Sequence, residues 1–193
     1  HVCAGAVIGQ DCVIGQNGYV ASTTIIGDRC RIQNNVSLYD GVILEQDVFI
    51  GPSVVFTNVI NPRAMISRRA EYQTTRVQRG ATIGANATIL PGITLGPFCF
   101  VAAGAVVVRD VPAHALMMGV PAVQSGWMSR AGYRLQFAPG ANEAVCPSTG
   151  DRYRVVGNRL EAVEEHSSGG ALMPTETHTV GGRPELIFAL EPY

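Results

Sequence analysis

The chain has 193 residues, carries a net charge of −1 at pH 7 and takes all of its basic residues from arginine. A charge so close to zero argues against a nucleic-acid partner and against binding to a charged membrane surface. The longest nearly unbroken apolar run, Cys99 to Val108, is too short to cross a bilayer, so we expect no membrane insertion. Five cysteines and the lack of a visible signal peptide favour a reducing, cytoplasmic location.

A ladder of large apolar residues spaced six apart organises the first part of the chain. Its rungs are Val2, Ile8, Ile14, Val20, Ile26, Ile32, Leu38, Leu44, Ile50 and Phe56. A helix repeats every 3.6 residues and an ordinary strand every 2, so neither explains a period of six. A β-solenoid with a triangular cross-section does explain it, because each six-residue side is a short strand and a turn. Three sides make a coil of 18 residues, and we expect coils over residues 2–19, 20–37 and 38–55.

Two features of the first coils concern their surroundings. Cys12 and Cys30 occupy the small inward slot of their hexads and would stack about 4.8 Å apart on neighbouring coils, within disulfide reach. We favour reduced, buried thiols over a disulfide. Val2 is already in register at the start of the chain, and a bare solenoid end would expose strand edges. We therefore expect earlier coils of the natural protein to precede His1.

The six-residue rhythm fails after Phe56, and we expect residues 57–79 to leave the solenoid as a loop. The ladder resumes 21 residues later at Val77, which is not a multiple of six, and Asn61-Pro62 marks an outward turn. Against one acidic residue, the segment carries the arginines Arg63, Arg68, Arg69, Arg76 and Arg79. So many guanidinium groups favour an anion-binding role, and the alternative is a solvated loop that keeps the solenoid soluble.

The ladder then continues in a new phase and predicts two more coils and an exit strand. Its rungs are Val77, Ile83, Ile89, Leu95, Val101 and Val107. From Trp127 the composition changes, and YRLQF, AVCPSTGDRYRVV and NRLEAV read as short strands.

The CPSTG stretch that begins at Cys146 resembles the second knuckle of a zinc ribbon. Thr149 stands at the expected last ligand position, and the other knuckle would fall near Ser129 and Ala131. One thiol cannot make a tetrahedral site, so we expect no metal. We expect a degenerate ribbon over residues 128–165 and a mobile tail over residues 166–193.

Segments such as IGQDCV, IGDRCR and IGANAT resemble the hexapeptide repeats of left-handed β-helix acyltransferases. The run FTNVINPR, followed by RRAEY, is similar to one branch of that family, the UDP-2-acetamido-3-amino-2,3-dideoxyglucuronate N-acetyltransferases of bacterial surface polysaccharide biosynthesis. The resemblance extends from the first residues to Trp127. It implies an all-β fold: a single-stranded, left-handed parallel β-helix over residues 1–127 with an ejected loop and a small C-terminal β segment. It also implies a homotrimer in which acetyl-CoA and a UDP-amino sugar bind between subunits.

The same resemblance implies roles for individual residues. Asn58, in FTN, would orient the acceptor amine beside the thioester, with the departing CoA sulfur as the final proton acceptor. A histidine base is not expected, because no histidine lies between His1 and His114. Glu71 is a second catalytic candidate, as a base or as a partner for an arginine. The residues implied for the sugar nucleotide are Asn35, Tyr39, Arg63, Arg68 and Arg69, and those for acetyl-CoA are Gly84, Ala85, Ala103, Gly104 and Arg109, with Arg130 as an alternative to the last.

Other functions would leave different traces in the sequence. An acetyltransferase of another nucleotide-linked amino sugar would keep the fold and change only the loop. A γ-type carbonic anhydrase needs three histidines around zinc, and the solenoid before the loop offers only His1. A non-catalytic solenoid scaffold would show flat ladders of threonine and no arginine loop.

Overall fold

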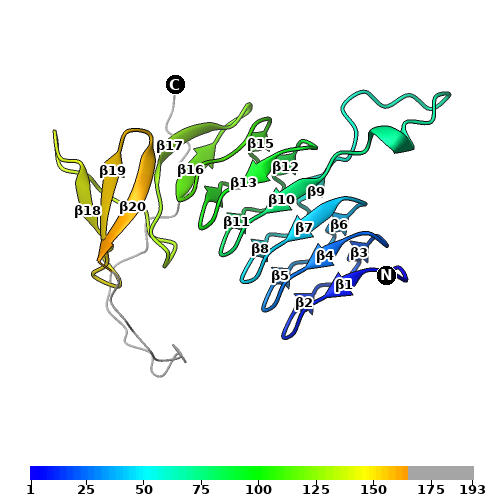
Figure 1. The fold of residues 1–193 in the computed structure, drawn as a ribbon, viewed down its shortest axis with the longest axis horizontal. Helices are drawn as coiled ribbons and strands as arrows, with labels where there is room; N and C mark the ends of the chain where they lie inside the picture. Colours follow the sequence, from blue (N-terminus) through cyan, green and yellow to red (C-terminus); the bar gives the residue numbers. More distant parts are fainter. Residues whose placement is uncertain (165–193) are drawn as a thin grey trace.

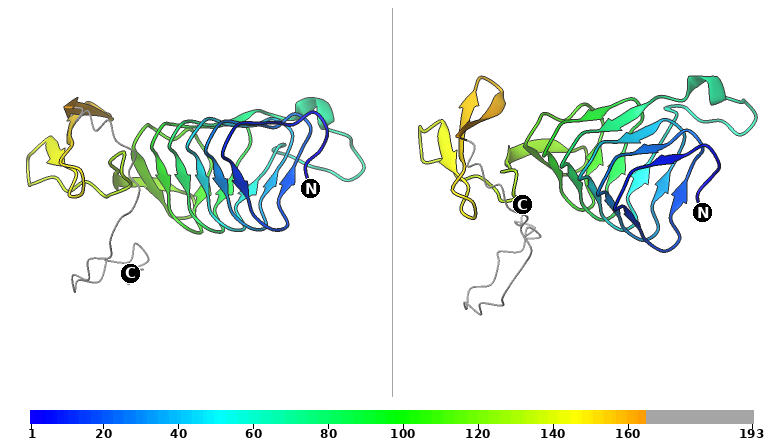
Figure 2. Two further views of the ribbon diagram at one scale, coloured as in Figure 1. Left: turned by 90° about the horizontal axis from the view of Figure 1, so that it is seen from below. Right: turned by 60° about the horizontal axis from the view of Figure 1, so that its bottom comes forward.

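The computed structural model of the chain describes residues 1–164, so the tail expected over residues 166–193 lies outside the described residues. Residues 1–118 form a three-sided column of stacked coils, and a small antiparallel sheet follows at its C-terminal end (Figure 1). The view in the right panel of Figure 2 shows the three sides of the coils. Over residues 1–164 the fold is all-β apart from one short 3-10 helix, as the six-residue period predicted.

Each side of the column is one sheet of short strands. The first side contains β1 (Val7–Ile8), β4 (Ile25–Ile26), β7 (Val42–Leu44), β10 (Thr75–Val77) and β13 (Thr94–Leu95). The second contains β2 (Val13–Ile14), β5 (Arg31–Ile32), β8 (Phe49–Ile50), β11 (Thr82–Ile83), β14 (Phe100–Val101), β16 (Ala115–Met118) and β17 (Val123–Trp127). The third contains β3 (Tyr19–Val20), β6 (Ser37–Leu38), β9 (Val55–Phe56), β12 (Thr88–Ile89) and β15 (Val106–Val107).

The rungs of the ladder fill the interior of the column. Strands of successive coils pair in parallel 18 residues apart, as in Ile8↔Ile26 and Ile83↔Val101, so that each rung lies over the one before it. From Val20 to Val107 every rung is at most 1% exposed. At the uncovered end Val2 and Ile8 are 49% and 37% exposed, because no coil lies beneath them. The predicted core is therefore confirmed.

The corners stack as closely as the sides. A Cβ atom on Gly84 would lie 2.5 Å from the backbone nitrogen of Ala103 in the next coil, so only glycine fits there. Most corners turn through a residue with a positive φ, and Asn35 and Asn86 adopt this conformation at φ 61° and 57°. These two asparagines thus close turns of the column.

The loop is shorter than expected. Val77 pairs with Leu44, which lies 33 positions earlier instead of 18, so 15 extra residues leave the column. The Gln73 N–H donates to the Asn58 carbonyl at 3.0 Å and closes the neck of the loop, which spans residues 58–73 and contains the 3-10 helix η1 (Arg69–Glu71). Arg76 lies within strand β10 and Arg79 on a corner of the next side, so the expected boundaries at residues 57 and 79 were too wide. The loop projects away from the C-terminal sheet, past the N-terminal end of the column (Figure 2).

A hairpin and an antiparallel sheet complete the described chain. Strand β17 folds back on β16, and β18 (Glu143–Val145), β19 (Arg152–Val156) and β20 (Arg159–Glu164) form the sheet. The YRLQF segment predicted as a strand is irregular. The Cys146 thiol donates to the Ser129 hydroxyl at 3.2 Å, which joins the two turns expected to be ribbon knuckles. In residues 1–164 no group of three or more His, Cys, Asp or Glu side chains is arranged to hold a metal ion.

The sequence also led us to expect reduced thiols and no membrane-spanning segment. All five cysteines are free, and the Cys12 and Cys30 thiols instead donate to the carbonyls of Gly27 and Glu45, each at 3.1 Å. Burial raises the pKa of the Cys30 thiol to about 11, which keeps it protonated and unreactive at neutral pH. In the described part of the chain, no helix has the length and apolar character needed to span a bilayer.

Candidate functional site

The loop folds around a cavity of its own. The cavity has a volume of about 200 Å³ and is lined by Val59, Pro62, Arg63, Ile66, Ser67, Arg68, Arg69 and Tyr72. A backbone bridge between Arg63 and Ile66 and the turn of η1 give the loop this shape. The structure therefore brings together the three loop arginines that the sequence assigned to substrate.

Arg68 is the most enclosed of these arginines. Its Nη1 donates to both carboxylate oxygens of Glu71, at 2.8 and 3.0 Å, while its Nε is buried and has no hydrogen-bond partner. An unpaired buried donor costs free energy that a ligand acceptor could recover. Glu71 thus has the arginine-partner role that the sequence left open beside a catalytic one.

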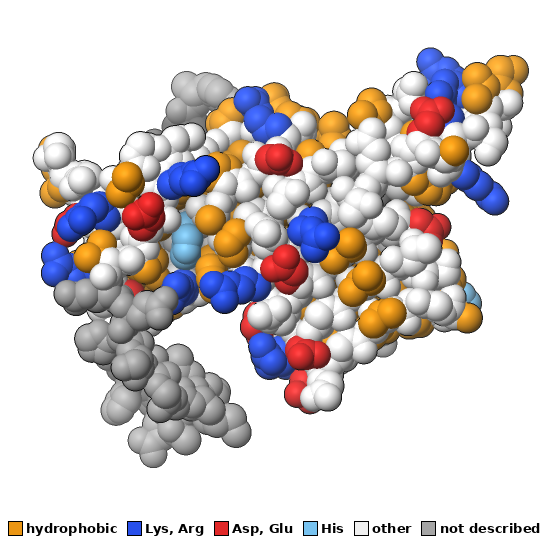
Figure 3. Space-filling view, viewed as in Figure 1, with side chains coloured by type: hydrophobic (Ala, Val, Ile, Leu, Met, Phe, Trp, Pro, Cys, Tyr) orange, Lys and Arg blue, Asp and Glu red, His pale blue; other side chains and the backbone are white. Residues whose placement is uncertain are grey.

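The loop carries a net positive charge. Residues 58–73 contain three arginines and one glutamate, a net charge of +2 in a chain of net charge −1. Figure 3 shows the basic side chains on the projecting loop together with apolar ones. Of the two other arginines expected in the loop, both of which lie on the column, Arg76 is 3.9 Å from Glu45, and the Arg79 guanidinium carbon is 5.6 Å from the ring centroid of Phe98. The positive charge available to a ligand is therefore smaller than five arginines would give.

Asn58 stands where the loop leaves the column. It is half-buried, and its backbone carbonyl holds the neck, but in residues 1–164 its carboxamide has no hydrogen-bond partner. Its side chain is therefore available to a ligand at the root of the loop, which fits the orienting role implied by the sequence.

The structure separates Asn35 from the loop. The Asn35 carboxamide oxygen accepts from Asn17 Nδ2 at 3.0 Å, one coil away, and both residues occupy equivalent left-handed turn positions. This ladder lies on the corner between the second and third sides, whereas the loop leaves between the third and first. Tyr39 does lie on the loop corner, 43% exposed, with its ring centroid 5.9 Å from that of Tyr19.

Four of the residues implied for acetyl-CoA form one exposed ledge of small residues. Gly84 and Ala85 begin one turn, and Ala103 and Gly104 form the turn of the next coil, with the Gly104 N–H donating to the Ala85 carbonyl at 2.8 Å. A Cβ atom on Gly104 would meet nothing within 4 Å, so the backbone here is open to a close approach. This ledge suits an extended ligand that runs along the main chain.

The arginines considered for the CoA phosphates are not on this ledge. By the pairings Phe56↔Ile89 and Ile89↔Val107, Arg109 lies two coils above Asn58 on the loop corner. Arg130 lies on the remaining corner, where its guanidinium carbon is 5.6 Å from the ring centroid of Phe98. Within one chain, the structure brings neither arginine to the Gly84–Gly104 ledge.

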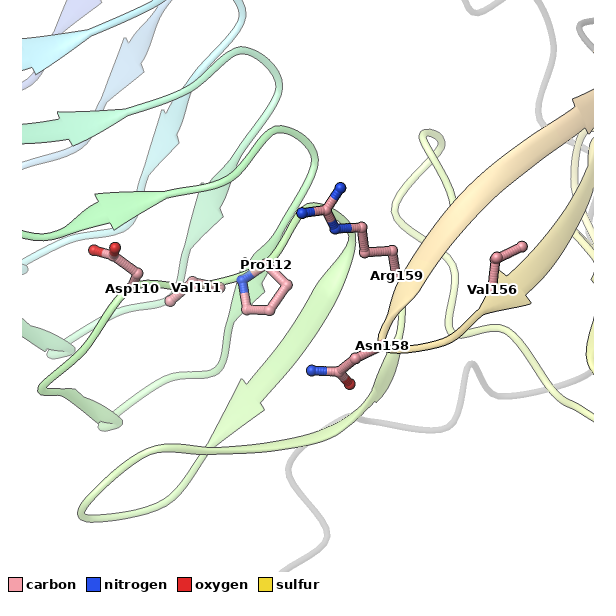
Figure 4. A pocket seen from close by; sticks show the side chains of 6 residues that line it. All are labelled: Asp110, Val111, Pro112, Val156, Asn158 and Arg159. Atoms are coloured by element: carbon pink, nitrogen blue, oxygen red, sulfur yellow. The ribbon is translucent and has the colours of Figure 1, made fainter.

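A second, larger hollow lies between the last coil and the C-terminal sheet. It measures about 540 Å³ and is lined by Asp110, Val111, Pro112, Val156, Asn158 and Arg159. Figure 4 shows Asn158 and Arg159 facing Pro112 across it. Asp110 caps the neighbouring coil by accepting the Thr94 N–H at 2.7 Å. None of the residues implied for catalysis or substrate binding lines this hollow.

One charged residue near the loop, Asp40, belongs to a polar corner for which the sequence left capping and ligand binding equally open. Asp40 lies on the loop corner one coil before Asn58, directly after Tyr39. The 18-residue spacing between Asp40 and Asn58 was the signal that could have found it.

A column of three-sided coils with six residues to each side is the structure of one class of proteins, the hexapeptide-repeat β-solenoids. Residues 5–40 match the family model "Hexapeptide repeat of succinyl-transferase", and residues 23–58 and 74–109 match "Bacterial transferase hexapeptide (six repeats)". In these parts the chain is therefore similar to the hexapeptide repeats of bacterial transferases. The predicted left-handed parallel β-helix is confirmed with this assignment.

The curated relatives that match part of the chain include two N-acetyltransferases. The dTDP-3-amino-3,6-dideoxy-alpha-D-galactopyranose 3-N-acetyltransferase of Aneurinibacillus thermoaerophilus is 42% identical over 80 residues, which cover 42% of this chain and 40% of the relative. The 2,3,4,5-tetrahydropyridine-2,6-dicarboxylate N-acetyltransferase of Enterococcus faecalis is 52% identical over 46 residues, 24% of this chain and 20% of the relative. The matched regions span less than half of either relative.

Solved structures share the fold. A hexapeptide-repeat acetyltransferase of Vibrio cholerae in complex with acetyl coenzyme A is 28% identical, with a TM-score of 0.58 over 65% of this chain and 72% of that one. A galactoside acetyltransferase in complex with coenzyme A has a TM-score of 0.57 at 22% identity, covers 65% of this chain and 66% of that one, and is similar in fold alone.

Proposed function

We propose that this chain is an acetyltransferase that moves the acetyl group of acetyl-CoA to the amino group of a nucleotide-linked sugar. The observation that carries the proposal is the folded arginine loop at a corner of a hexapeptide column, with Asn58 at its root. The name of the Aneurinibacillus relative describes acetylation of a 3-amino group on a nucleotide sugar, and the Vibrio structure holds acetyl coenzyme A. Both support the assignment of donor and acceptor.

The loop favours an acceptor with more than one negative group. A UDP-linked 3-amino uronic acid brings a diphosphate and a carboxylate, and Arg63, Arg68 and Arg69 surround one cavity that could receive such groups. Each charge-assisted hydrogen bond would contribute about 1.5–3 kcal/mol. Tyr39, exposed on the same corner, offers a face on which the sugar or its base can pack. Such a reaction belongs to the cytoplasmic synthesis of bacterial surface polysaccharides.

The site requires a second chain. The loop projects away from its own column (Figures 1 and 2). The ledge at Gly84 and Gly104 lies between the second and third sides, on a different corner from Asn58. We therefore propose a homotrimer in which the loop and the ledge of neighbouring chains meet around acetyl-CoA. Arg109, or Arg130 in its place, would then reach the CoA phosphates from a neighbouring chain.

Most of the catalysis would come from positioning. Holding amine and thioester in attack geometry can supply about 7–11 kcal/mol, which exceeds the roughly 10²–10⁴-fold acceleration expected from a general base. Asn58 would orient the amine, and as the new C–N bond forms and the C–S bond breaks, the nitrogen proton ends on the CoA sulfur. The arginines and Tyr39 would set the distance between the reactants.

A dTDP-linked amino sugar is the second candidate acceptor, because the Aneurinibacillus relative is named for one. Thiol release from acetyl-CoA, measured against a panel of UDP- and dTDP-linked amino sugars with and without a carboxylate, separates the two. We expect the highest kcat/KM with the UDP-linked 3-amino uronic acid. A higher value with a neutral dTDP sugar would overturn the uronate assignment, and no thiol release with any amino sugar would overturn the function.

A further inference from the structure

Asp40 lies directly beneath the root of the loop. A Cβ atom on the next residue, Gly41, would be 3.2 Å from the carbonyl oxygen of Gln73, and the Gly41 carbonyl accepts the Thr75 N–H at 3.0 Å. Gln73 in turn is hydrogen-bonded to the Asn58 carbonyl at 3.0 Å. The turn that carries Asp40 is therefore in contact with the neck that carries Asn58.

The corner holds the Asp40 side chain in place and leaves part of it unoccupied. The Thr23 hydroxyl donates to Asp40 Oδ1 at 2.8 Å and accepts the Gly41 N–H at 3.2 Å. Beneath it the buried Thr24 hydroxyl bonds to the carbonyls of Leu38 and Tyr39, at 3.2 and 3.3 Å. In residues 1–164 the second carboxylate oxygen of Asp40 has no hydrogen-bond or ion-pair partner, and the residue is half-buried. Asp40 is thus a fixed acceptor with one oxygen free.

The other carboxylates near the loop are already engaged. Glu71 is paired with Arg68, and Glu45 accepts the Arg79 N–H and lies near Arg76. Asp40 instead stands beside the exposed ring of Tyr39, and no arginine pairs with it in the described residues. Asp40 is thus an isolated negative charge next to a loop of net charge +2. This arrangement is complementary to an acceptor whose anionic groups bind the loop and whose basic nitrogen faces the carboxylate.

We propose that the free oxygen of Asp40 accepts a hydrogen bond from the acceptor amine and takes its proton during acetyl transfer, so that this residue selects amines as acceptors. The inference rests on the proposed acetyltransferase function. The neutral amine attacks the thioester carbon, and the nitrogen, which becomes positively charged as the C–N bond forms, gives one proton to the Asp40 carboxylate. The C–S bond breaks, and the CoA sulfur takes that proton, so the products are an acetamide and a thiol. Asp40 returns to its ionised form.

The test compares Asp40→Asn with the matched control Asp28→Asn. Both aspartates accept one hydrogen bond across neighbouring coils, since Asp28 Oδ1 accepts the Gln10 N–H at 2.8 Å, but Asp28 lies on another corner. The carboxamide introduced by Asp40→Asn would keep an oxygen that can accept the Thr23 hydroxyl, so the corner should remain folded. We expect kcat with the amino sugar to fall about 10²-fold or more, with the KM for acetyl-CoA within twofold of the original chain. Asp28→Asn should change neither value.

A binding measurement distinguishes selection of the amine from a structural effect. Titration calorimetry with the amino sugar nucleotide and with its counterpart bearing a hydroxyl group should show that the original chain prefers the amine, and that Asp40→Asn removes this preference while leaving the hydroxyl sugar unaffected. Thr23→Val, which frees the carboxylate, should give a smaller loss of kcat. A kcat of Asp40→Asn within twofold of the original chain, or an unchanged preference for the amine, would refute the proposal. An original chain with no activity on any amino sugar would instead refute the function itself.

Discussion

The interior of the column can be tested by making one substitution at two depths. Ile83 is 0% exposed, with Ile50 and Val101 in register on either side, whereas Ile8 occupies the same hexad position at the uncovered end and is 37% exposed. Ile→Ala removes three carbon atoms, worth roughly 2.4 kcal/mol when fully buried at about 0.8 kcal/mol each. The cavity left in a close-packed interior raises the cost at Ile83 to about 2–5 kcal/mol. At Ile8 no coil lies beneath the side chain, so a loss of about 1 kcal/mol or less is expected.

Urea denaturation followed by circular dichroism measures both losses. Ile83→Ala should lower the midpoint of unfolding with little change in slope, and Ile8→Ala should shift it much less. A second probe is the fluorescence of the single tryptophan, Trp127, which packs against both the column core and the core of the C-terminal sheet. Equal losses for the two variants would refute the argument that the rungs share one continuous interior.

Three further predictions concern the loop and the junction with the C-terminal sheet. In steady-state assays, Arg68→Ala should raise the KM for the nucleotide sugar about 10- to 100-fold and leave the KM for acetyl-CoA within twofold. The control Arg29→Ala removes a remote ion pair with Asp47 and should alter neither KM. Asn58→Ala should lower kcat at least about tenfold while sedimentation gives the same oligomeric state as for the original chain, and full activity would remove this residue from the mechanism. Burial, aided by the nearby Arg130, lowers the pKa of His114 below its ordinary 6.5 despite the hydrogen bond to the Met128 carbonyl. The stability that depends on neutral His114 is therefore complete above pH 6.5 and is lost as the pH falls from 6.5 through the lowered pKa, so Tm should decline more steeply over this window in the original chain than in His114→Gln.

The sequence was sufficient to predict the column because its information is repeated in every coil. Inward positions recur every six residues, and all of the rungs from Val20 to Val107 are buried where the ladder placed them. The same six-residue spacing could also have shown that the loop ends earlier than predicted. The residue before a rung is the outward residue of a strand, so Arg76, immediately before Val77, belongs to the first side of the column.

Other parts of the site carry no repeat from which to argue. An asparagine that closes a left-handed turn and one that binds a sugar look alike in sequence, and only the equivalent Asn17, 18 residues earlier, hinted at the structural role of Asn35. The shape of residues 58–73 depends on contacts within the loop, such as the pair between Arg68 and Glu71, which follow no period. The arrangement of a site between chains depends also on the neighbouring chain. For these reasons the functional assignments of single residues stay predictions, whereas the fold is settled.

The neck of the loop has a consequence for how such a protein can change. On one side of it Thr57 remains bonded to Ile89, and on the other Thr75 remains paired with Val42, so the coils above and below stay aligned whatever is inserted between them. An insertion at this corner can grow, shrink or be replaced in evolution without shifting any rung. New ligand preferences can therefore arise here while the scaffold that presents them is inherited intact.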